Sequence, residues 1–269
     1  MKLLNKPITY FVQHPDDVVG RKSFEYLEAT FTDTLFVRSE FATLQGEGPF
    51  AGQYAYFIRL AGCNYGSKTT HCKFCDTDFR MSLSQMRSFS GLREAWSNKK
   101  CDLVVVTGGE PTLQQKVVDL CIKYPDTHFQ FETNGTQTEV VHRLLDLPNV
   151  TVVISPKYSV TGAMITPTDK MLDLATFKFL VSADSTHYEY VLPEWTFKCK
   201  KPVYLSPIAV YLRAYEGEVT NAWDQTLIDT ESTRMNYAHA ANMVQSLSEY
   251  TGNRNIRLSI QQHLFTSIP

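Results

Sequence analysis

Short runs of β-branched and aromatic residues, each about the length of one strand, recur through most of the chain and limit the folds open to it. We predict strands at residues 54–60, 103–107, 129–132, 150–154, 177–181, 203–205 and 256–260. Several of these runs are almost continuously apolar instead of alternating apolar with polar residues, as in LVVV at residues 103–106. Strands that helices bury on both faces have this composition, so the pattern favours a parallel sheet.

Helical patterns separate the predicted strands. We predict helices at residues 111–123, with a proline in the first turn, at 138–145 and at 232–250, where Gly252 follows as a stop signal. A further helix is predicted at residues 23–29. The apolar stripes consist of Leu113, Val117, Leu120 and Cys121 in the first helix and of Tyr237, Ala240, Ala241, Val244 and Leu247 in the third. Alternating strands and helices predict an α/β fold, either an incomplete (β/α) barrel or a doubly wound sheet, and both bind ligands at strand C-termini.

The length and composition indicate one large α/β domain. The chain has 269 residues, of which 43% are hydrophobic and 20% charged. Residues 1–34 carry no recognisable chemistry and are interpreted as an N-terminal extension to a core at 35–269, and the polar segment 209–231 is interpreted as an insertion loop.

Charge and hydropathy limit the cellular location and the classes of binding partner that we expect. The net charge of −2 argues against a broad electrostatic surface for nucleic acid or for an anionic membrane. No apolar stretch approaches the roughly 18 residues of a membrane helix, and the N-terminus lacks the apolar region of a signal peptide. We therefore expect a cytoplasmic protein without a membrane or nucleic-acid partner.

Three of the six cysteines lie close together in the stretch CNYGSKTTHCKFC, residues 63–75. In a reduced compartment, clustered cysteines indicate metal binding before disulfides. Cys72 and Cys75 have the spacing that lets two thiolates reach one metal centre, and Cys63 follows a predicted strand directly. The other three, Cys101, Cys121 and Cys199, occur singly beside strand or helix patterns and are interpreted as buried thiols.

The cysteine cluster has two interpretations. One is a structural zinc site with His71 or a distant residue as the fourth ligand, although His71 adjoins Cys72 and no second CxxC completes the set. The other is a four-iron cluster on three thiolates, whose remaining iron binds the amino acid end of a nucleotide cofactor. Radical chemistry with S-adenosylmethionine uses such a cluster.

The segment LVVVTGGEP, residues 103–111, supports the iron–sulfur interpretation. An apolar strand ends here in two glycines, then Glu110, then a proline that starts a helix. Glycines allow the backbone to approach a ligand closely, and Glu110 is suited to accept a hydrogen bond from a cationic amino group. Alone, the segment reads as an ordinary strand-to-helix turn.

With both segments present, the chain resembles the radical S-adenosylmethionine superfamily, and more closely the 7-carboxy-7-deazaguanine synthases. The matching stretches run from about residue 35 to the C-terminus. They are FATLQGEGPFAGQYAYFIRLAGCN (41–64), CKFCDTDF (72–79), VVTGGEPTLQ (105–114), FETNGT (131–136), ISPK (154–157), FKFLV (177–181), YLSP (204–207) and RLSIQQH (257–263). Two departures are visible: the gap between Cys63 and Cys72 is longer than is usual in the superfamily, and Ser206 stands where the family commonly has glutamine.

The resemblance implies a set of cofactors and the residues that bind them. A [4Fe-4S] cluster would be held by Cys63, Cys72 and Cys75, and Mg²⁺ by Thr77, whose single hydroxyl suits a hard ion that takes other oxygens from water and substrate. The S-adenosylmethionine site would comprise Phe74, Cys75, Asp76, Gly109, Glu110, Ser155, Pro156, Lys157, Ser206, Pro207 and Ile208, with Glu132 and Asn134 as weaker candidates.

The resemblance also implies the substrate, 6-carboxy-5,6,7,8-tetrahydropterin, and its conversion to 7-carboxy-7-deazaguanine by ring contraction with loss of ammonia. Arg59 offers a fork to the carboxylate, and Gln45 and Glu47 suit the edge of the pterin ring. Substrate contacts would come from Leu44, Gln45, Gly46, Glu47, Arg59, Thr107, His263 and the terminal Pro269. No side chain is assigned as a catalytic group, because the radical comes from the cofactor.

A homodimer and an electron donor such as flavodoxin or ferredoxin are further expectations from the family. Two rival functions remain open at this point. One is a radical activase that takes hydrogen from a glycine of a partner protein, and LQGEG with Gln262 and His263 argues against it. The other is a metal-binding scaffold without catalytic activity.

Overall fold

The structure is a computed structural model, and it describes residues 32–65, 79, 81, 84–158, 163–210, 228–251 and 255–262. The chain divides into two compact units. Unit 1 comprises residues 1–43, 54–72 and 77–152, and unit 2 comprises residues 44–53, 73–76 and 153–269.

The strands form one mixed sheet of nine, in the order β3-β1-β2-β4-β5-β6-β7-β8-β9. The order ends at β3 and β9, so the sheet does not close on itself within the described chain. The strand β6 (Val150–Ile154) supplies residues to both units. The prediction of an α/β fold is confirmed, and a sheet that does not close is consistent with the predicted incomplete (β/α) barrel.

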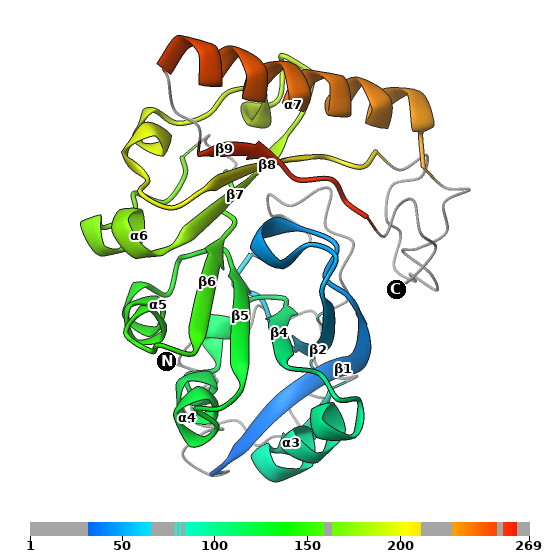
Figure 1. The fold of residues 1–269 in the computed structure, drawn as a ribbon, viewed down its shortest axis with the longest axis vertical. Helices are drawn as coiled ribbons and strands as arrows, with labels where there is room; N and C mark the ends of the chain where they lie inside the picture. Colours follow the sequence, from blue (N-terminus) through cyan, green and yellow to red (C-terminus); the bar gives the residue numbers. More distant parts are fainter. Residues whose placement is uncertain are drawn as a thin grey trace, which may run out of the picture. The chain divides into compact units, whose positions relative to one another are not determined.

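The core of unit 1 is built on β2 (Tyr54–Leu60), β4 (Leu103–Gly108) and β5 (His128–Thr133). These strands pair in parallel, with Ala55 opposite Leu103 and Leu103 opposite His128. Residues 103–106 are buried completely, as expected for a strand covered on both faces. The helices α4 (Lys116–Lys123) and α5 (Thr138–Leu145) contact each other and lie side by side (Figure 1).

Unit 1 also contains elements that we did not predict. The strand β1 (Thr34–Leu44) pairs antiparallel with the short strand β3 (Gln85–Ser88), and α3 (Phe89–Asn98) follows. The side chain of Ser88 caps α3 by accepting a hydrogen bond of 3.1 Å from the backbone N–H of Gly91. Both strands carry polar residues in irregular positions, which hides them from a search for apolar runs.

The predicted helix at 111–123 is wrong in its first part. The structure has a 3₁₀ turn, η3 (Pro111–Leu113), a break, and then α4. Gln114 adopts an extended conformation at the break, and its buried amide binds both backbone groups of Phe36 and the carbonyl of Ala61 at 2.9–3.2 Å. These three hydrogen bonds join the break to β1 and to the residue that follows β2, and a continuous helix would lose them.

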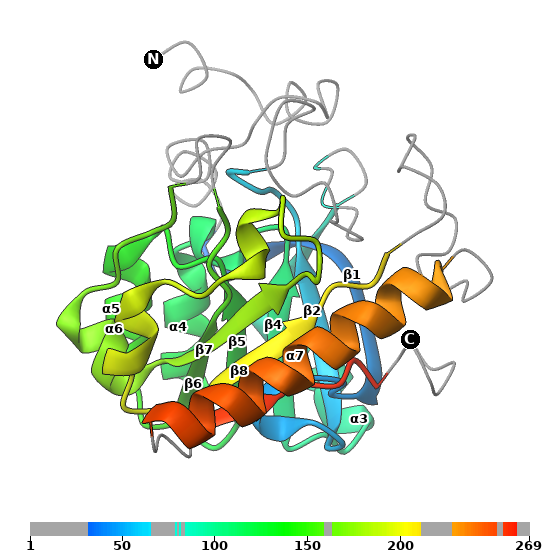
Figure 2. The ribbon, with the colours of Figure 1, turned by 90° about the horizontal axis from the view of Figure 1, so that it is seen from above.

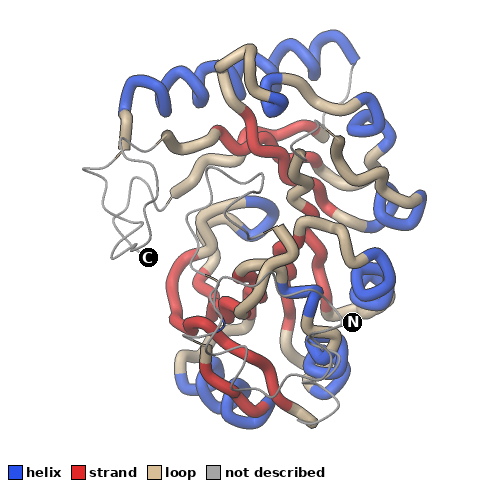
Figure 3. Tube along the Cα trace, turned by 180° about the vertical axis from the view of Figure 1, so that it is seen from behind, coloured by secondary structure: helices blue, strands red, loops and turns tan. Residues whose placement is uncertain are grey.

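Unit 2 contains the parallel strands β7 (Thr176–Val181), β8 (Val203–Pro207) and β9 (Ile256–Leu258), and the end of β6 pairs with β7. The helix α7 (Thr230–Thr251) packs along β8 and β9, as Figure 2 shows. A shorter helix, α6 (Asp169–Leu174), and the 3₁₀ turns η4 (Tyr188–Tyr190) and η5 (Glu194–Lys198) lie in the connections. In the rear view of Figure 3, α7 lies on the outside of these strands.

The predicted stripe of α7 is partly wrong. Ala240 is buried and Tyr237 is half-buried, but Ala241 is exposed, because one position along a helix turns the side chain by about 100°. The helix begins before Ser232, because the Asp229 carboxylate accepts hydrogen bonds from the N–H groups of Glu231 and Ser232. Among the described residues, no helix combines the length and the apolarity needed to cross a bilayer. The helix predicted at residues 23–29 lies outside the described residues.

Candidate active site

In unit 1, the glycine turn after β4 packs directly against the chain that leaves β2. Gly108 has a φ of +132°, and a side chain there would overlap the backbone of Leu60. A side chain on Gly109 would overlap the carbonyl of Gly62. The Gly109 N–H donates to the Leu60 carbonyl at 3.2 Å, and the Glu110 N–H donates to the Gly62 carbonyl at 2.8 Å. In the described structure, the glycines permit a close approach between the turn after β4 and the chain that leaves β2. The two hydrogen bonds fix the backbone that leads into Cys63.

Glu110 lies inside this turn, with none of its surface exposed. Its carboxylate accepts hydrogen bonds from the Thr112 hydroxyl, from the Thr112 N–H at 3.0 Å, and from the Thr133 hydroxyl and the Asn134 N–H, both at 2.6 Å. Burial raises the pKa of Glu110, and the four hydrogen bonds oppose that rise. Its role in this structure is to join the glycine turn to the end of β5.

Cys63 is half-buried at the end of β2, and its Sγ accepts a hydrogen bond from the Tyr65 N–H at 3.4 Å. Hydrogen bonds of this kind stabilise thiolates that hold iron–sulfur clusters and tune their potentials. Asn64 is held at both ends of its amide, by the Asn134 amide and by the Thr136 hydroxyl, each at 2.9 Å. The environment of Cys63 therefore fits a thiolate ligand on a fixed backbone.

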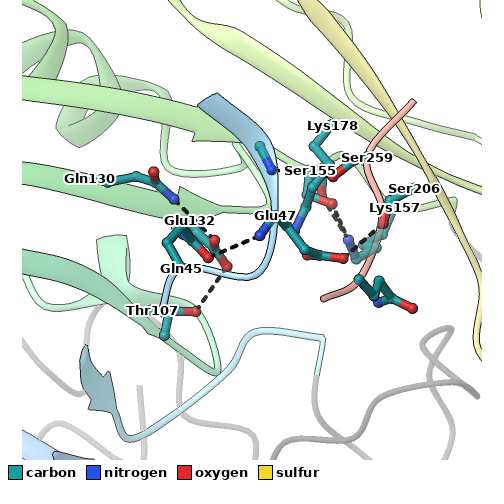
Figure 4. A network of polar contacts seen from close by, with 12 residues as sticks. Gln45, Glu47, Thr107, Gln130, Glu132, Ser155, Lys157, Lys178, Ser206 and Ser259 are labelled. Carbon is teal, nitrogen blue, oxygen red and sulfur yellow. Dashed lines mark hydrogen bonds and ion pairs between the residues drawn. The ribbon is translucent and has the colours of Figure 1, made fainter. Parts of the chain in front are cut away.

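Four other polar side chains project from neighbouring strands of unit 1. Arg59 in β2 stands opposite Thr107 in β4, and its guanidinium lies 5.4 Å from the ring centroid of Phe41. The Thr107 hydroxyl donates a long hydrogen bond of 3.5 Å to Glu132. Gln130 donates to the other oxygen of Glu132 at 3.1 Å, and Figure 4 shows Thr107 and Gln130 reaching Glu132 from two sides.

In unit 2, the segment LQGEG forms a compact turn. Gln45 is buried, and its backbone groups pair with Gln53 at 2.8 Å and Gly52 at 2.7 Å. The side-chain oxygen of Gln45 accepts from the Glu47 N–H at 3.3 Å, and the Gly48 N–H donates to the Ser259 hydroxyl at 3.2 Å. The turn thus has a defined backbone from which Glu47 projects, whereas Leu44 at its start is exposed.

The Glu47 carboxylate is held by two strands of unit 2. One oxygen forms an ion pair with the Lys178 ammonium of β7, and the other accepts from the Ser206 hydroxyl of β8 at 2.8 Å (Figure 4). Burial, and to a smaller extent the charge of Glu47, raises the pKa of Tyr237 in α7, while a hydrogen bond from the Gln261 N–H opposes the rise. The half-buried Glu47 therefore belongs to a polar cluster with the buried side chains of Lys178 and Ser206.

The remaining described candidates in unit 2 are also held in place. Ser155 is buried, and Lys157 donates from its ammonium group to the Ser155 hydroxyl at 2.6 Å and to the Ser155 carbonyl at 3.1 Å. The carbonyl of Ile208 accepts from the Asn236 amide at 2.8 Å. Pro156, Pro207 and Ile208 are buried.

Comparison with known proteins finds relatives that share one name, 7-carboxy-7-deazaguanine synthase. The protein from Rickettsia prowazekii is 37% identical over 170 residues, which are 60% of this chain and 67% of that protein. The protein from Rhodospirillum rubrum is 36% identical over 159 residues, covering 57% of this chain and 61% of that protein. The protein from Hyperthermus butylicus is 37% identical over 189 residues, which cover 65% of this chain and 77% of that protein.

The chain belongs to the 7-carboxy-7-deazaguanine synthase family. It is therefore an enzyme of the radical S-adenosylmethionine type, as the sequence motifs indicated. The crystal structure of QueE from Escherichia coli matches with a TM-score of 0.55 at 22% identity, over 96% of this chain and 99% of that one, so the fold is shared. No protein-family model matches the chain.

Several family residues predicted from the sequence lie outside the described residues: Phe74, Asp76, Thr77, His263, Pro269 and two of the cysteines, Cys72 and Cys75. Their roles stay predictions. Among the described residues, no group of three His, Cys, Asp or Glu side chains is arranged to hold a metal ion, and of the three predicted cluster ligands only Cys63 is described.

The prediction that the three single cysteines are buried thiols is confirmed. Cys101, Cys121 and Cys199 are free and buried. Burial raises the pKa of Cys199 to about 12 and also raises the pKa of Cys101 and Cys121. These groups stay protonated thiols near neutral pH, unlike the thiolates that a cluster requires.

The sequence analysis missed two residues that contact these carboxylates: Lys178, which pairs with Glu47, and Gln130, which donates to Glu132. Lys178 interrupts the apolar strand FKFLV, and Gln130 interrupts FQFE. Gln130 is completely buried, and its side-chain oxygen accepts no hydrogen bond from the described residues. A single polar residue inside an apolar strand was the available signal, because such a residue is costly to bury without a purpose.

Proposed function

We propose that this chain is a 7-carboxy-7-deazaguanine synthase, converting 6-carboxy-5,6,7,8-tetrahydropterin to 7-carboxy-7-deazaguanine with loss of ammonia in the queuosine and deazapurine pathway. The relation to enzymes of that name, at 37% identity over 77% of the Hyperthermus butylicus protein, carries the proposal. The packing of the glycine turn against the chain leading to Cys63 supports it, because that packing would hold a cluster ligand in place.

The proposed cofactors are a [4Fe-4S] cluster, S-adenosylmethionine and Mg²⁺. Cys63, Cys72 and Cys75 would hold the cluster, and Thr77 the magnesium ion. When bound, cluster and S-adenosylmethionine supply a 5′-deoxyadenosyl radical, for which this superfamily's barrel fold is the expected scaffold. The part of the chain is to bind S-adenosylmethionine through the backbone at Gly109, the 155–157 segment and the 206–208 segment, and to exclude water from the radical.

The proposed role of the substrate-binding residues is to orient the pterin so that one hydrogen is removed. Arg59, whose guanidinium is stacked against Phe41, is suited to a carboxylate because its planar fork can donate two hydrogen bonds. Thr107 and Gln45 would add hydrogen bonds, and Glu47 would accept from the aminopyrimidine edge. His263 and Pro269 remain proposed contacts from the sequence.

The assembly and the location are also proposals. From the resemblance to the family, we infer a cytoplasmic homodimer that receives electrons from a flavodoxin or a ferredoxin. Size-exclusion chromatography with light scattering tests the dimer, and a monomer at micromolar concentration would reject it.

The test of the reaction is an anaerobic incubation of the full chain, reconstituted with iron and sulfide, with the pterin, S-adenosylmethionine, Mg²⁺ and a reductant. Mass analysis is expected to show 7-carboxy-7-deazaguanine and 5′-deoxyadenosine. Activation of a glycyl partner protein without pterin turnover would favour the activase, and a colourless, zinc-loaded protein would favour the scaffold. Either result would overturn the proposal.

A further inference from the structure

Lys178 lies in the middle of β7, and only 7% of its surface is exposed. Lysine is among the residues least often buried in proteins, because its ammonium group loses hydration when it leaves water. A buried lysine therefore needs a partner of opposite charge, and here that partner is Glu47.

Lys178 and Ser206 bind the Glu47 carboxylate from two neighbouring strands, β7 and β8. The parallel register places Lys178 opposite Tyr204 and Leu180 opposite Ser206, so the side chains of Lys178 and Ser206 lie on the same face of the sheet, two positions apart. Each binds a different oxygen of Glu47. Contacts to both oxygens fix the plane of a carboxylate, whereas one contact leaves it free to rotate.

The backbone at Glu47 is held by hydrogen bonds other than those that Lys178 and Ser206 make to its side chain. Hydrogen bonds from the N–H of Glu47 to Gln45 and from the N–H of Gly48 to Ser259 fix the turn on both sides of the residue. The position of the turn therefore does not depend on Lys178 and Ser206, whose contacts to Glu47 orient its carboxylate.

We propose that Lys178 and Ser206 are positioning residues that hold Glu47 as an oriented anion for the aminopyrimidine edge of the pterin. The inference rests on the proposed function. An anionic carboxylate in a fixed plane can accept two parallel N–H bonds from such an edge, and charged hydrogen bonds are about twice as strong as neutral ones. Without Lys178, Glu47 would lose the cation that holds one of its two oxygens. The serine at position 206, where the family commonly has glutamine, has in this chain the role of a second donor to Glu47.

A purely structural role predicts a different outcome from a positioning role. Replacing a buried ion pair by apolar residues is often neutral for stability, whereas removing one partner leaves an uncompensated charge. If Lys178 acts through Glu47, its removal must affect pterin binding only while Glu47 retains its charge. A double-mutant cycle makes this distinction.

The experiment uses the full reconstituted chain and compares Lys178→Met, Glu47→Gln, the double variant and Lys178→Arg. The exposed Lys198→Met in unit 2 serves as the matched control. The readouts are KM for the pterin, kcat, the ratio of 5′-deoxyadenosine to product, and the thermal midpoint. Lys178→Met is expected to raise KM about thirtyfold or more, a loss typical for a buried charge pair with one partner truncated, and to increase uncoupled 5′-deoxyadenosine.

In the Glu47→Gln background, Lys178→Met is expected to change KM less than about threefold, and Lys178→Arg should recover part of the loss. Because Lys178→Met can also impair folding, Ser206→Ala provides a second route: it removes one hydrogen bond and should raise KM about fivefold, again only while Glu47 is present. A wild-type KM in both Lys178→Met and Ser206→Ala, or equal losses with and without Glu47, would overturn the inference. Absence of product from the wild type would instead overturn the proposed function.

Discussion

Two carboxylates, the buried Glu110 in unit 1 and the half-buried Glu47 in unit 2, are satisfied in different ways. Glu110 receives hydrogen bonds from two hydroxyls and two backbone N–H groups, and none of these four donors carries a charge. Glu47 receives one hydroxyl and the ammonium group of Lys178. Neutral donors from a turn and a strand end suit a carboxylate that joins parts of the scaffold. A counter-charge suits one that must stay anionic for a ligand.

The largest effect is expected for Glu110→Ala. The substitution leaves four buried donors of Thr112, Thr133 and Asn134 without their acceptor, and we expect it to lower the free energy of unfolding by about 3 kcal/mol or more. Urea denaturation measures the change, with the exposed Glu94→Ala as a control expected within about 0.5 kcal/mol of wild type. A loss below about 1 kcal/mol would mean that Glu110 is not the scaffold residue that its contacts indicate.

A somewhat smaller effect is expected at the glycine turn that precedes Glu110. Gly108→Ala introduces a side chain at a φ of +132° and against the backbone of Leu60, so we expect a loss of about 2 kcal/mol or more. Gly52→Ala is the matched control, because its φ is +89° but the space around it is open, and we expect a loss of about 1 kcal/mol. Equal losses at the two positions would show that backbone strain alone matters, and that the close approach to Leu60 does not.

The parts that could be predicted from the sequence are those whose signal is local. β2 and β6 were predicted with their observed bounds, because each is an apolar run of strand length. β3 has four residues, its partner strand β1 lies far away in sequence, with Thr34 opposite Ser88, and its mostly polar side chains give no period. The break at Gln114 could not be predicted either, because its cause is hydrogen bonding to Phe36, 78 positions earlier.

The same limit applies to the site. The segments with Cys63, the glycine turn and LQGEG were found because their residue types are unusual in sequence. The ligand-binding role of Glu110 stays a prediction, whereas the donors that bury it come from residues at or just after the ends of β4 and β5, which no local pattern reveals. Lys178 was overlooked for the converse reason: only the turn that carries Glu47, 131 positions away, explains a lysine inside an apolar strand.

The pH dependence of stability tests whether burial or hydrogen bonding dominates at Glu110. Burial raises its pKa above the ordinary value of 4.5, so the folded state binds the proton more tightly than the unfolded state. That contribution to stability is complete below the unfolded pKa and is lost as the pH rises through the folded pKa. Relative to Glu110→Gln, the wild type should therefore lose stability as the pH rises above the ordinary range of a carboxyl group, measured by urea denaturation at each pH. A difference that grows in favour of the wild type would mean that the four hydrogen bonds outweigh burial.

The smallest effect on stability is expected where the pair of charges is removed completely. In the double variant Glu47→Met with Lys178→Met, two side chains of similar length fill the space without leaving a charge, so the free energy of unfolding should stay within about 1 kcal/mol of wild type. The same variant should bind the pterin poorly, because the anion is gone. Unchanged stability with weak pterin binding would distinguish the role of Glu47 from that of Glu110, whose removal is expected to lower the free energy of unfolding. If the double variant instead loses as much stability as Glu110→Ala, the two carboxylates play the same structural role, and the lysine in β7 is retained for folding and not for the ligand.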